Sequence, residues 1–426
     1  MSTPFRVDPG EPSPRTPRQN PVLATRARLS AKLGKFVPSL TLSLKALAQE
    51  RRRRGLPIYD FGLGETRGEL APAIADAAAT AYREGRTQYA DPSGLVELRQ
   101  AVLDWLGLEG RYGADSVVVT TGAKQSLFNI FLALADPGDC FLFDCAPWVS
   151  YQPLAVASYA SPVMVEPTAG TRDFLKISSR DLERTLKLHP QARLFLLNSP
   201  CNPTGQVYSA AEVEELLSVC VEHGVYFVLD RLYWQLVLDG EAFPSPRIDE
   251  ETLPWVIQVD GLSKNFRRTG GLRIGWTVAP ADVARAMTNL QSHYTSGPSV
   301  PAQHAALAAV SQPYDTGMRA DIRRKADLMR REAESLPHVD AWPTVGAFYS
   351  FWDVHDCLGR RTPDGELLES SADVAAYLLE AAGLISLPGE AFLQEGYLRL
   401  SITLPDEELV AGVRSAVVAL ERLESP

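Results

Sequence analysis

The stretch GLSKNFRRTGGLRIG occupies residues 261–275 of the 426-residue chain, and the architecture can be read outward from it. Lys264 follows a hydroxyl residue, and a glycine pair comes after it, before Arg273 opens the apolar run 274–278. Such an arrangement suits a lysine bound covalently to a phosphorylated aldehyde, because glycines permit tight turns and a guanidinium holds phosphate with a planar set of donors. A lysine on a polar surface loop fits the stretch equally well, so the rest of the sequence must decide.

The composition is that of a globular protein and favours neither nucleic acid nor membranes as partners. Hydrophobic residues make up 45% of the chain and charged residues 22%. The formal net charge is −10, whereas a protein that binds nucleic acid needs a basic face. Four arginines at 51–54 form one dense basic run, which is typical of the solvated end of a helix. No apolar run reaches ~18 residues, so no membrane span is predicted.

The cysteines and the N-terminus indicate where the protein works. The five cysteines are odd in number and none has C-x-x-C spacing, so we predict neither a disulfide framework nor a zinc or other metal site. Such cysteine usage fits a reducing cytoplasm. Residues 1–22 are rich in proline, arginine and polar residues and lack the apolar core of a signal peptide, so we expect a disordered tail.

Short apolar runs alternate with helical segments through the middle of the chain. The runs lie at 117–120, 140–143, 163–165, 194–197, 225–229, 256–259 and 274–278. This alternation predicts an α/β domain whose mainly parallel sheet is covered by helices on both faces. In such sheets ligands bind beyond the carboxyl ends of the strands.

The pattern changes after residue 280. A mostly helical stretch is followed by β-like and helical segments, which predicts a smaller α+β domain. We therefore expect a disordered tail over 1–22 and an N-terminal arm that joins the small domain over 23–70. A large cofactor-binding domain is expected over 71–300, and a C-terminal small domain over 301–426.

Polar segments follow several of the predicted strands. Gly122, Ala123 and Lys124 lie between a strand and a helix, where backbone N–H groups form an anion site, although an ordinary turn also fits. Asn202 lies in NSPCNPTG, residues 198–205, whose prolines and glycine make a rigid turn that would aim its side chain. Ordinary turn chemistry explains that motif equally well.

Asp230 ends a buried apolar run, and Tyr233 follows three residues later. A carboxylate there is costly unless it meets a cation, which a protonated pyridine nitrogen would supply, and Tyr233 would then donate to an oxygen on the same ring. An aspartate at a helix N-cap is the alternative. Together with Lys264, these segments provide a phosphate cup, a donor to a ring oxygen, a carboxylate for a ring nitrogen and a lysine for an aldehyde. Pyridoxal 5′-phosphate meets all four requirements.

With these motifs, residues 23–423 resemble the class I aminotransferases of the fold-type I pyridoxal-phosphate superfamily, and most of all the bacterial aspartate aminotransferases. The resemblance implies a mainly parallel seven-stranded sheet, a homodimer with two composite active sites, and transfer of an amino group from an L-amino acid to a 2-oxo acid. Lys124 resembles the position that meets a distal carboxylate, which favours a dicarboxylic donor.

The resemblance also assigns roles by position. Lys264 matches the catalytic lysine. The positions that match cofactor-binding residues of the family are Gly122, Ala123, Lys124, Trp148, Asn202, Asp230, Tyr233, Arg273 and Tyr89, and those that match substrate-binding residues are Gly64 and Arg399. Among them, Trp148 matches the aromatic residue that stacks on the cofactor ring, and Tyr89 the tyrosine that reaches a phosphate across the dimer interface. Arg399 matches the arginine that binds the substrate α-carboxylate, with Gly64 beside it.

The chain departs from the family pattern at four arginines. They are Arg67, Arg231, Arg267 and Arg268. They indicate either a pocket for an anionic or phosphate-bearing substrate or, more simply, solvated loop residues. Because the same fold serves lyases, cyclases, oxidases and enzymes that replace groups at Cβ or Cγ, these reactions remain alternatives. A regulatory module that binds the cofactor without turnover is disfavoured, because residues 1–22 are too short for a helix-turn-helix.

Overall fold

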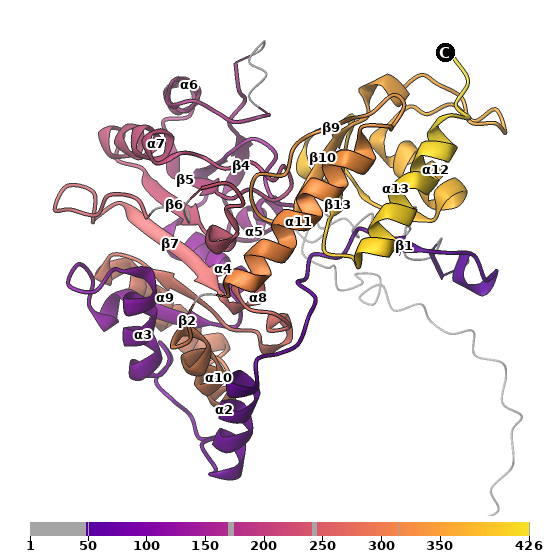
Figure 1. Ribbon diagram of the computed structural model, residues 1–426. Helices are drawn as coiled ribbons and strands as arrows, with labels where there is room; N and C mark the ends of the chain where they lie inside the picture. The colour runs from indigo at the N-terminus through magenta and orange to yellow at the C-terminus, as the bar shows by residue number, and fades with distance from the viewer. Residues whose placement is uncertain (1–47, 50, 169–173, 241–244, 314, 426) are drawn as a thin grey trace, which may run out of the picture. The chain divides into compact units, whose positions relative to one another are not determined.

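The structure is a computed structural model that describes residues 48–49, 51–168, 174–240, 245–313 and 315–425. The predicted tail over 1–22 lies outside these residues. A seven-stranded sheet forms the centre (Figure 1). Its strands, in spatial order, are β2 (Val117–Thr120), β8 (Gly275–Val278), β7 (Val256–Gly261), β6 (Tyr226–Asp230), β5 (Ala192–Asn198), β3 (Cys140–Phe143) and β4 (Ser161–Met164). Only β8 runs antiparallel to its neighbours, which confirms the mainly parallel α/β sheet.

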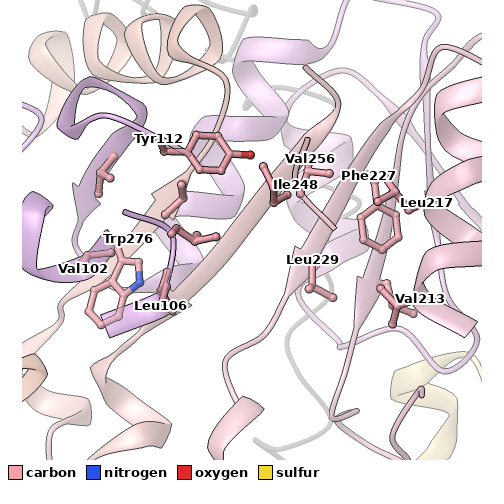
Figure 2. Packing of buried hydrophobic residues seen from close by; sticks show 14 of the residues in the cluster. Val102, Leu106, Tyr112, Val213, Leu217, Phe227, Leu229, Ile248, Val256 and Trp276 are labelled. Atoms are coloured by element: carbon pink, nitrogen blue, oxygen red, sulfur yellow. The ribbon is translucent and has the colours of Figure 1, made fainter. Parts of the chain in front are cut away.

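The central strands are mostly apolar because both faces of the sheet are buried. Phe227 and Leu229 of β6 face one core cluster, whereas Val228 between them faces another. Alternate side chains of a strand point to opposite faces, so a continuous apolar run is what a doubly covered sheet requires. Figure 2 shows the first cluster, where these two side chains lie near Val213 and Leu217.

Helices cover the two faces as separate sets. The first cluster includes residues of α3 (Val96–Leu106), α6 (Ser179–Leu188), α7 (Ala210–Glu222) and α10 (Val300–Val310). The second includes residues of α4 (Ala123–Leu134), α5 (Tyr151–Ala157) and α9 (Ala281–Tyr294). Capping boxes fix two of the starts: Ser178 and Asp181 satisfy backbone N–H groups of α6, and Ser209 and Glu212 do so for α7. Helix α2 (Pro72–Arg83) packs against α10.

Four further strands form a second sheet, which packs with the C-terminal helices. Its order is β12 (Leu387–Pro388), β13 (Tyr397–Ser401), β10 (Tyr349–Asp353) and β9 (Asp340–Ala341), all paired antiparallel. The helices α11 (Thr316–Ala333), α12 (Ser371–Ala382) and α13 (Asp406–Leu420) share one hydrophobic cluster with it. Strand β1 (Tyr59–Asp60) pairs with β11 (Leu384–Ile385), so residues before 70 contact this part of the chain. The domain boundaries themselves remain predictions.

The register of the central sheet brings polar side chains to one edge. Asn198, the last residue of β5, pairs with Asp230, the last residue of β6. Strand β7 ends beside them and leads directly into α8 (Leu262–Asn265). Because parallel strands end at the same edge of a sheet, residues that follow them meet there. Within the described residues, no helix is long and apolar enough to cross a bilayer.

Candidate active site

A cavity of about 590 Å³ lies at this edge and collects most of the predicted site residues. Those that line it are Gly64, Ala123, Lys124, Trp148, Asn202, Asp230, Tyr233, Lys264, Arg273 and Arg399. Gly122 adjoins the cavity, because a Cβ atom at this position would lie 2.5 Å from Nη2 of Arg273. Tyr89 is the exception: its side chain is 95% exposed and does not line the cavity.

Lys264 lies on the short helix α8, immediately after β7. Its Nζ donates a hydrogen bond to the carbonyl oxygen of Gly64 and lies 5.7 Å from the centre of the Phe348 ring. Burial, and then the guanidinium groups of Arg399 and Arg273, lowers the pKa of Lys264 from 10.5 to about 8. The amine is therefore neutral far more often than that of an ordinary lysine, as attack on an aldehyde requires.

A phosphate-sized cup lies where α4 begins. Gly122 precedes the helix with φ = +81°, a backbone conformation that glycine adopts without strain. A Cβ atom there would meet the Arg273 guanidinium, so the absence of a side chain allows the arginine to approach the helix N-terminus. Backbone N–H groups and a guanidinium that converge in this way favour an anion with several oxygens.

Asp230 is a buried carboxylate without a cation partner in the described part of the chain. Its Oδ2 accepts a 2.8 Å hydrogen bond from the Tyr151 hydroxyl, and its Oδ1 accepts one of 3.2 Å from the Leu232 N–H. Burial raises its pKa to about 6, although both hydrogen bonds oppose that rise. The next helical turn begins at Trp234 with Tyr233 as its N-cap, so Asp230 is not a helix cap. A cation on a ligand, such as a pyridinium, satisfies this carboxylate.

Asn202 and Tyr233 lie together at the ring-oxygen position. Nδ2 of Asn202 is 3.5 Å from the Tyr233 hydroxyl, which in turn lies 3.0 Å from the hydroxyl of Tyr349. The backbone N–H of Asn202 donates to Oδ1 of Asn198 at 2.8 Å, which fixes the loop. Arg399 contributes from β13, where it donates to Oδ1 of Asn202 at 3.2 Å.

The Arg399 guanidinium is available for a carboxylate. The residue is 5% exposed, and its Nε has no hydrogen-bond partner among the described residues. Its Nη2 donates to the Gly62 carbonyl oxygen at 2.9 Å, and the guanidinium lies 4.5 Å from the centre of the Tyr349 ring. A buried cation that pairs with no acidic side chain is costly, and a substrate carboxylate would satisfy it with two parallel hydrogen bonds.

Three functional residues are missing from the sequence prediction. Tyr151 holds Asp230, Asn198 holds the Asn202 loop, and Tyr349 lies against both Tyr233 and Arg399. Tyr151 lies three residues after Trp148 in the sequence, and this short spacing was the available signal. In the structure the two rings meet edge-on, with their centres 5.5 Å apart. No signal in the sequence marks Tyr349.

Of the four unusual arginines, Arg231 is buried, whereas Arg67, Arg267 and Arg268 line smaller hollows outside the main cavity. Arg231 is 1% exposed and does not line the cavity, so the interpretation of Arg231 as a pocket or loop cation is wrong. Its Nη1 donates to Gln258 and Ser245 at 2.6 and 2.7 Å, and its guanidinium lies 4.9 Å from the centre of the Trp234 ring. Arg267 donates to Asp315 and to the Arg67 carbonyl oxygen.

The family profile "Aminotransferase class I and II" matches residues 57–415. A probable aspartate/prephenate aminotransferase of Aquifex aeolicus is 33% identical over 405 residues, which cover 93% of this chain and all of that one. An aspartate aminotransferase of Streptomyces avermitilis is 35% identical, over 91% of this chain and 95% of that one. The crystal structure of the Rhizobium meliloti aspartate aminotransferase superposes with a TM-score of 0.87 at 31% identity, over 93% of this chain and all of that one.

Proposed function

The chain belongs to the family of class I and II aminotransferases, and on this basis we propose its amino donor and the division of labour among its residues. It is a pyridoxal-phosphate-dependent enzyme of fold type I that transfers an amino group from an L-amino acid to a 2-oxo acid. Lyase, cyclase, replacement and oxidase reactions are not favoured, because the relatives are named as aminotransferases. We propose that the donor is a dicarboxylic L-amino acid such as aspartate.

The residues present fit pyridoxal phosphate. The cup at Gly122 and Arg273 suits its phosphate, and the unpaired buried carboxylate of Asp230 suits a protonated ring nitrogen. Asn202 and Tyr233 would hold the ring oxygen, and Lys264 the aldehyde carbon. When bound, the cofactor withdraws electrons from the substrate Cα–H bond.

The protein's own groups account for the rest of the reaction. Arg399 binds the α-carboxylate and thereby orients the substrate, so that the Cα–H bond is presented to the Lys264 amine. Lys264 would accept the Cα proton as a general base and donate it again as a general acid, which requires an amine that is readily neutral. Trp148 lines the cavity, and its ring would cover one face of a bound cofactor.

Lys124 carries the proposal for a dicarboxylic donor. It lines the cavity, its Nζ lies 4.9 Å from the centre of the Trp148 ring, and no acidic residue in the described part of the chain pairs with it. A distal carboxylate would meet this ammonium group. The names of the relatives, which include aspartate aminotransferases of Rhizobium meliloti and Streptomyces avermitilis, support the same donor.

Single-turnover spectra test this proposal. L-aspartate, L-glutamate, L-alanine and L-phenylalanine are mixed separately with the holoenzyme, and the loss of the visible cofactor band is recorded with the 2-oxo acid released. We expect the two dicarboxylic donors to react at least tenfold more efficiently than the others, a preference that Lys124→Gln weakens by about tenfold. The exposed Lys187 provides the matched control, Lys187→Gln. A preference for uncharged donors, or release of ammonia or hydrogen peroxide, contradicts the proposal.

We further propose that the enzyme is a cytoplasmic homodimer. The 95% exposed side chain of Tyr89 supports a surface that a second copy covers, and the position matches a tyrosine that reaches the partner's phosphate cup. All five cysteines are buried and unpaired, which supports a reducing compartment. Sedimentation of the unaltered protein at micromolar concentration tests the dimer, and a monomer contradicts it. Tyr89→Phe is expected to weaken cofactor binding, and an unchanged affinity in that variant contradicts the role of Tyr89.

A further inference from the structure

A second hollow adjoins the active-site cavity. It has a volume of about 430 Å³ and is lined by Leu63, Glu65, Thr66, Arg67, Arg268 and Gly271. Leu63, Glu65 and Gly271 line the active-site cavity as well, so the two spaces share a wall. A bound cofactor would take up part of the inner cavity, so a long substrate side chain would have this outer hollow to extend into.

The guanidinium group of Arg268 lines the outer hollow with free donors. Its backbone has φ = +55°, an uncommon conformation for a residue with a Cβ, and its Nε donates to the Gly68 carbonyl oxygen. Its two terminal nitrogens have no partner among the described residues. A guanidinium that is anchored through Nε presents its terminal nitrogens as a pair, which is the geometry that carboxylates and phosphates accept.

Arg67 adds a second cation, and its ion pair with an acidic side chain is weak. Its Nη1 lies 3.9 Å from Oε2 of Glu408, and the two side chains are 39% and 48% exposed. An exposed ion pair at this distance contributes little and is readily exchanged for a ligand. The carbonyl oxygen of Arg67 accepts a 3.0 Å hydrogen bond from Arg267, which holds the loop beside Arg268.

Thr66 contributes a buried hydroxyl that lacks a partner. The residue is 2% exposed and lines the outer hollow, and its Oγ1 makes no hydrogen bond within the described part of the chain. An unsatisfied buried hydroxyl is unfavourable, and an oxyanion that accepts its proton removes this cost.

Glu65 decides where an anion can lie. Its carboxylate lines both spaces and has no donor among the described residues, so it repels an anion held between them. Arg67 and Arg268 line the outer hollow but not the active-site cavity, so their two positive charges place the favourable position for an anion in the outer hollow.

We propose that Arg67, Arg268 and Thr66 form an anion subsite that takes the carboxylate or phosphate at the far end of an amino or 2-oxo acid longer than aspartate. This inference rests on the proposed transfer between anionic amino and 2-oxo acids, and it names a longer class of substrate for the same site. It assigns a binding role to two of the arginines at which the chain departs from its family pattern.

Binding of unreactive acids to the holoenzyme tests the subsite. The probes are succinate, with four carbons, adipate, with six, and 4-phosphonobutyrate, which carries a phosphonate at its far end; their dissociation constants are measured by titration calorimetry. We expect Arg67→Gln and Arg268→Gln each to weaken adipate or 4-phosphonobutyrate about three- to tenfold and to change succinate less than twofold. Whichever of the two longer acids shows the larger loss identifies the terminal group.

Two further variants make the result specific. Thr66→Val removes only the unpartnered hydroxyl, so it is expected to weaken the longer acids while leaving the thermal stability of the protein unchanged or higher. Arg330 is an exposed arginine of α11 that pairs with Glu334, and Arg330→Gln is expected to alter no dissociation constant. Equal losses for succinate and adipate, or no loss for the longer acids in the Arg67 and Arg268 variants, overturn the subsite.

The outcomes separate this inference from the proposed function. If the enzyme transfers amino groups from aspartate but the arginine variants bind the longer acids like the unaltered protein, the subsite is refuted and the donor proposal stands. If no dicarboxylic amino acid reacts while adipate binding still depends on both arginines, the donor proposal is refuted and the subsite stands. With L-2-aminoadipate as donor, kcat/KM relative to aspartate is expected to fall about three- to tenfold in each arginine variant.

Discussion

The amine of Lys264 is expected to titrate near pH 8 in the cofactor-free protein. Burial is the largest cause of the lowered pKa, followed by the guanidinium of Arg399, and Arg273 adds to it. The perturbation that tests this explanation is Arg399→Gln, which removes the largest charge contribution and leaves the burial of the amine intact. The pKa of Lys264 is then expected to rise from about 8 toward its ordinary value.

The size of the effect follows from the two pKa values. Their difference, 10.5 − 8 = 2.5, corresponds to about 3 kcal/mol against the ammonium form. At pH 7 about 10% of the amine is neutral, against about 0.03% for a lysine at its ordinary pKa. Between pH 8 and 10.5 the unfolded chain holds more of this proton than the folded chain. The contribution of Lys264 to stability therefore increases with pH through that window and is constant below it.

Competitive labelling measures this titration without the cofactor. The apoprotein is treated with trace 1-fluoro-2,4-dinitrobenzene across pH 6 to 11, and the modified Lys264 peptide is quantified by mass spectrometry, with the exposed Lys187 as reference for the reagent. The labelling midpoint of Lys264 is expected near pH 8, and at higher pH in Arg399→Gln. A midpoint near 10 in the unaltered protein refutes the explanation by burial, and an unmoved midpoint in the variant refutes the contribution of Arg399.

Three further predictions concern groups around the cavity. Tyr151→Phe removes the hydroxyl that donates to Asp230, so the pKa of Asp230 rises above about 6 and the cofactor dissociation constant increases about tenfold in an absorbance titration; an unchanged constant contradicts this. Arg231→Met removes the buried guanidinium that donates to Gln258 and Ser245 and opposes the rise that burial causes in the pKa of Asp260, so the free energy of unfolding in urea falls by about 1–3 kcal/mol, and unchanged stability contradicts this. Gly275→Ala places a methyl group against the backbone at the start of α4, so cofactor affinity falls at least 100-fold while circular dichroism is retained; near-normal affinity excludes the tight contact.

The centre of the site was predictable because strand order alone assembles it. Asp230 and Asn202 follow adjacent parallel strands, and Lys264 follows the next one, so their convergence requires only that the strands pair in parallel. The apolar runs predicted the sheet because they alternate with helical segments. The antiparallel direction of β8 carries no such signal in the sequence, because an apolar strand of four residues reads the same in either direction.

The positions of side chains that come from distant segments were not predictable in the same way. Arg399 meets Asn202 only because β13 belongs to the second sheet, and no local pattern relates the two residues. Tyr349 reaches the site through β10 of that sheet. The place of Arg231, by contrast, is predictable in principle, because consecutive residues of an extended chain point to opposite sides and a neighbour of Asp230 therefore points away from the cavity.

The charges of the cavity link substrate binding to the basicity of Lys264. Lys264, Arg273 and Arg399 line one space, and none forms an ion pair with an acidic side chain in the described part of the chain. Burial and the charges of Arg399 and Arg273 lower the pKa of this amine to about 8, although the Glu65 carboxylate opposes that change. A phosphate at Arg273 and an α-carboxylate at Arg399 each cancel one of the charges that lower the pKa of Lys264. The amine therefore becomes a stronger base when the substrate is in place, which is when a proton must be taken from Cα.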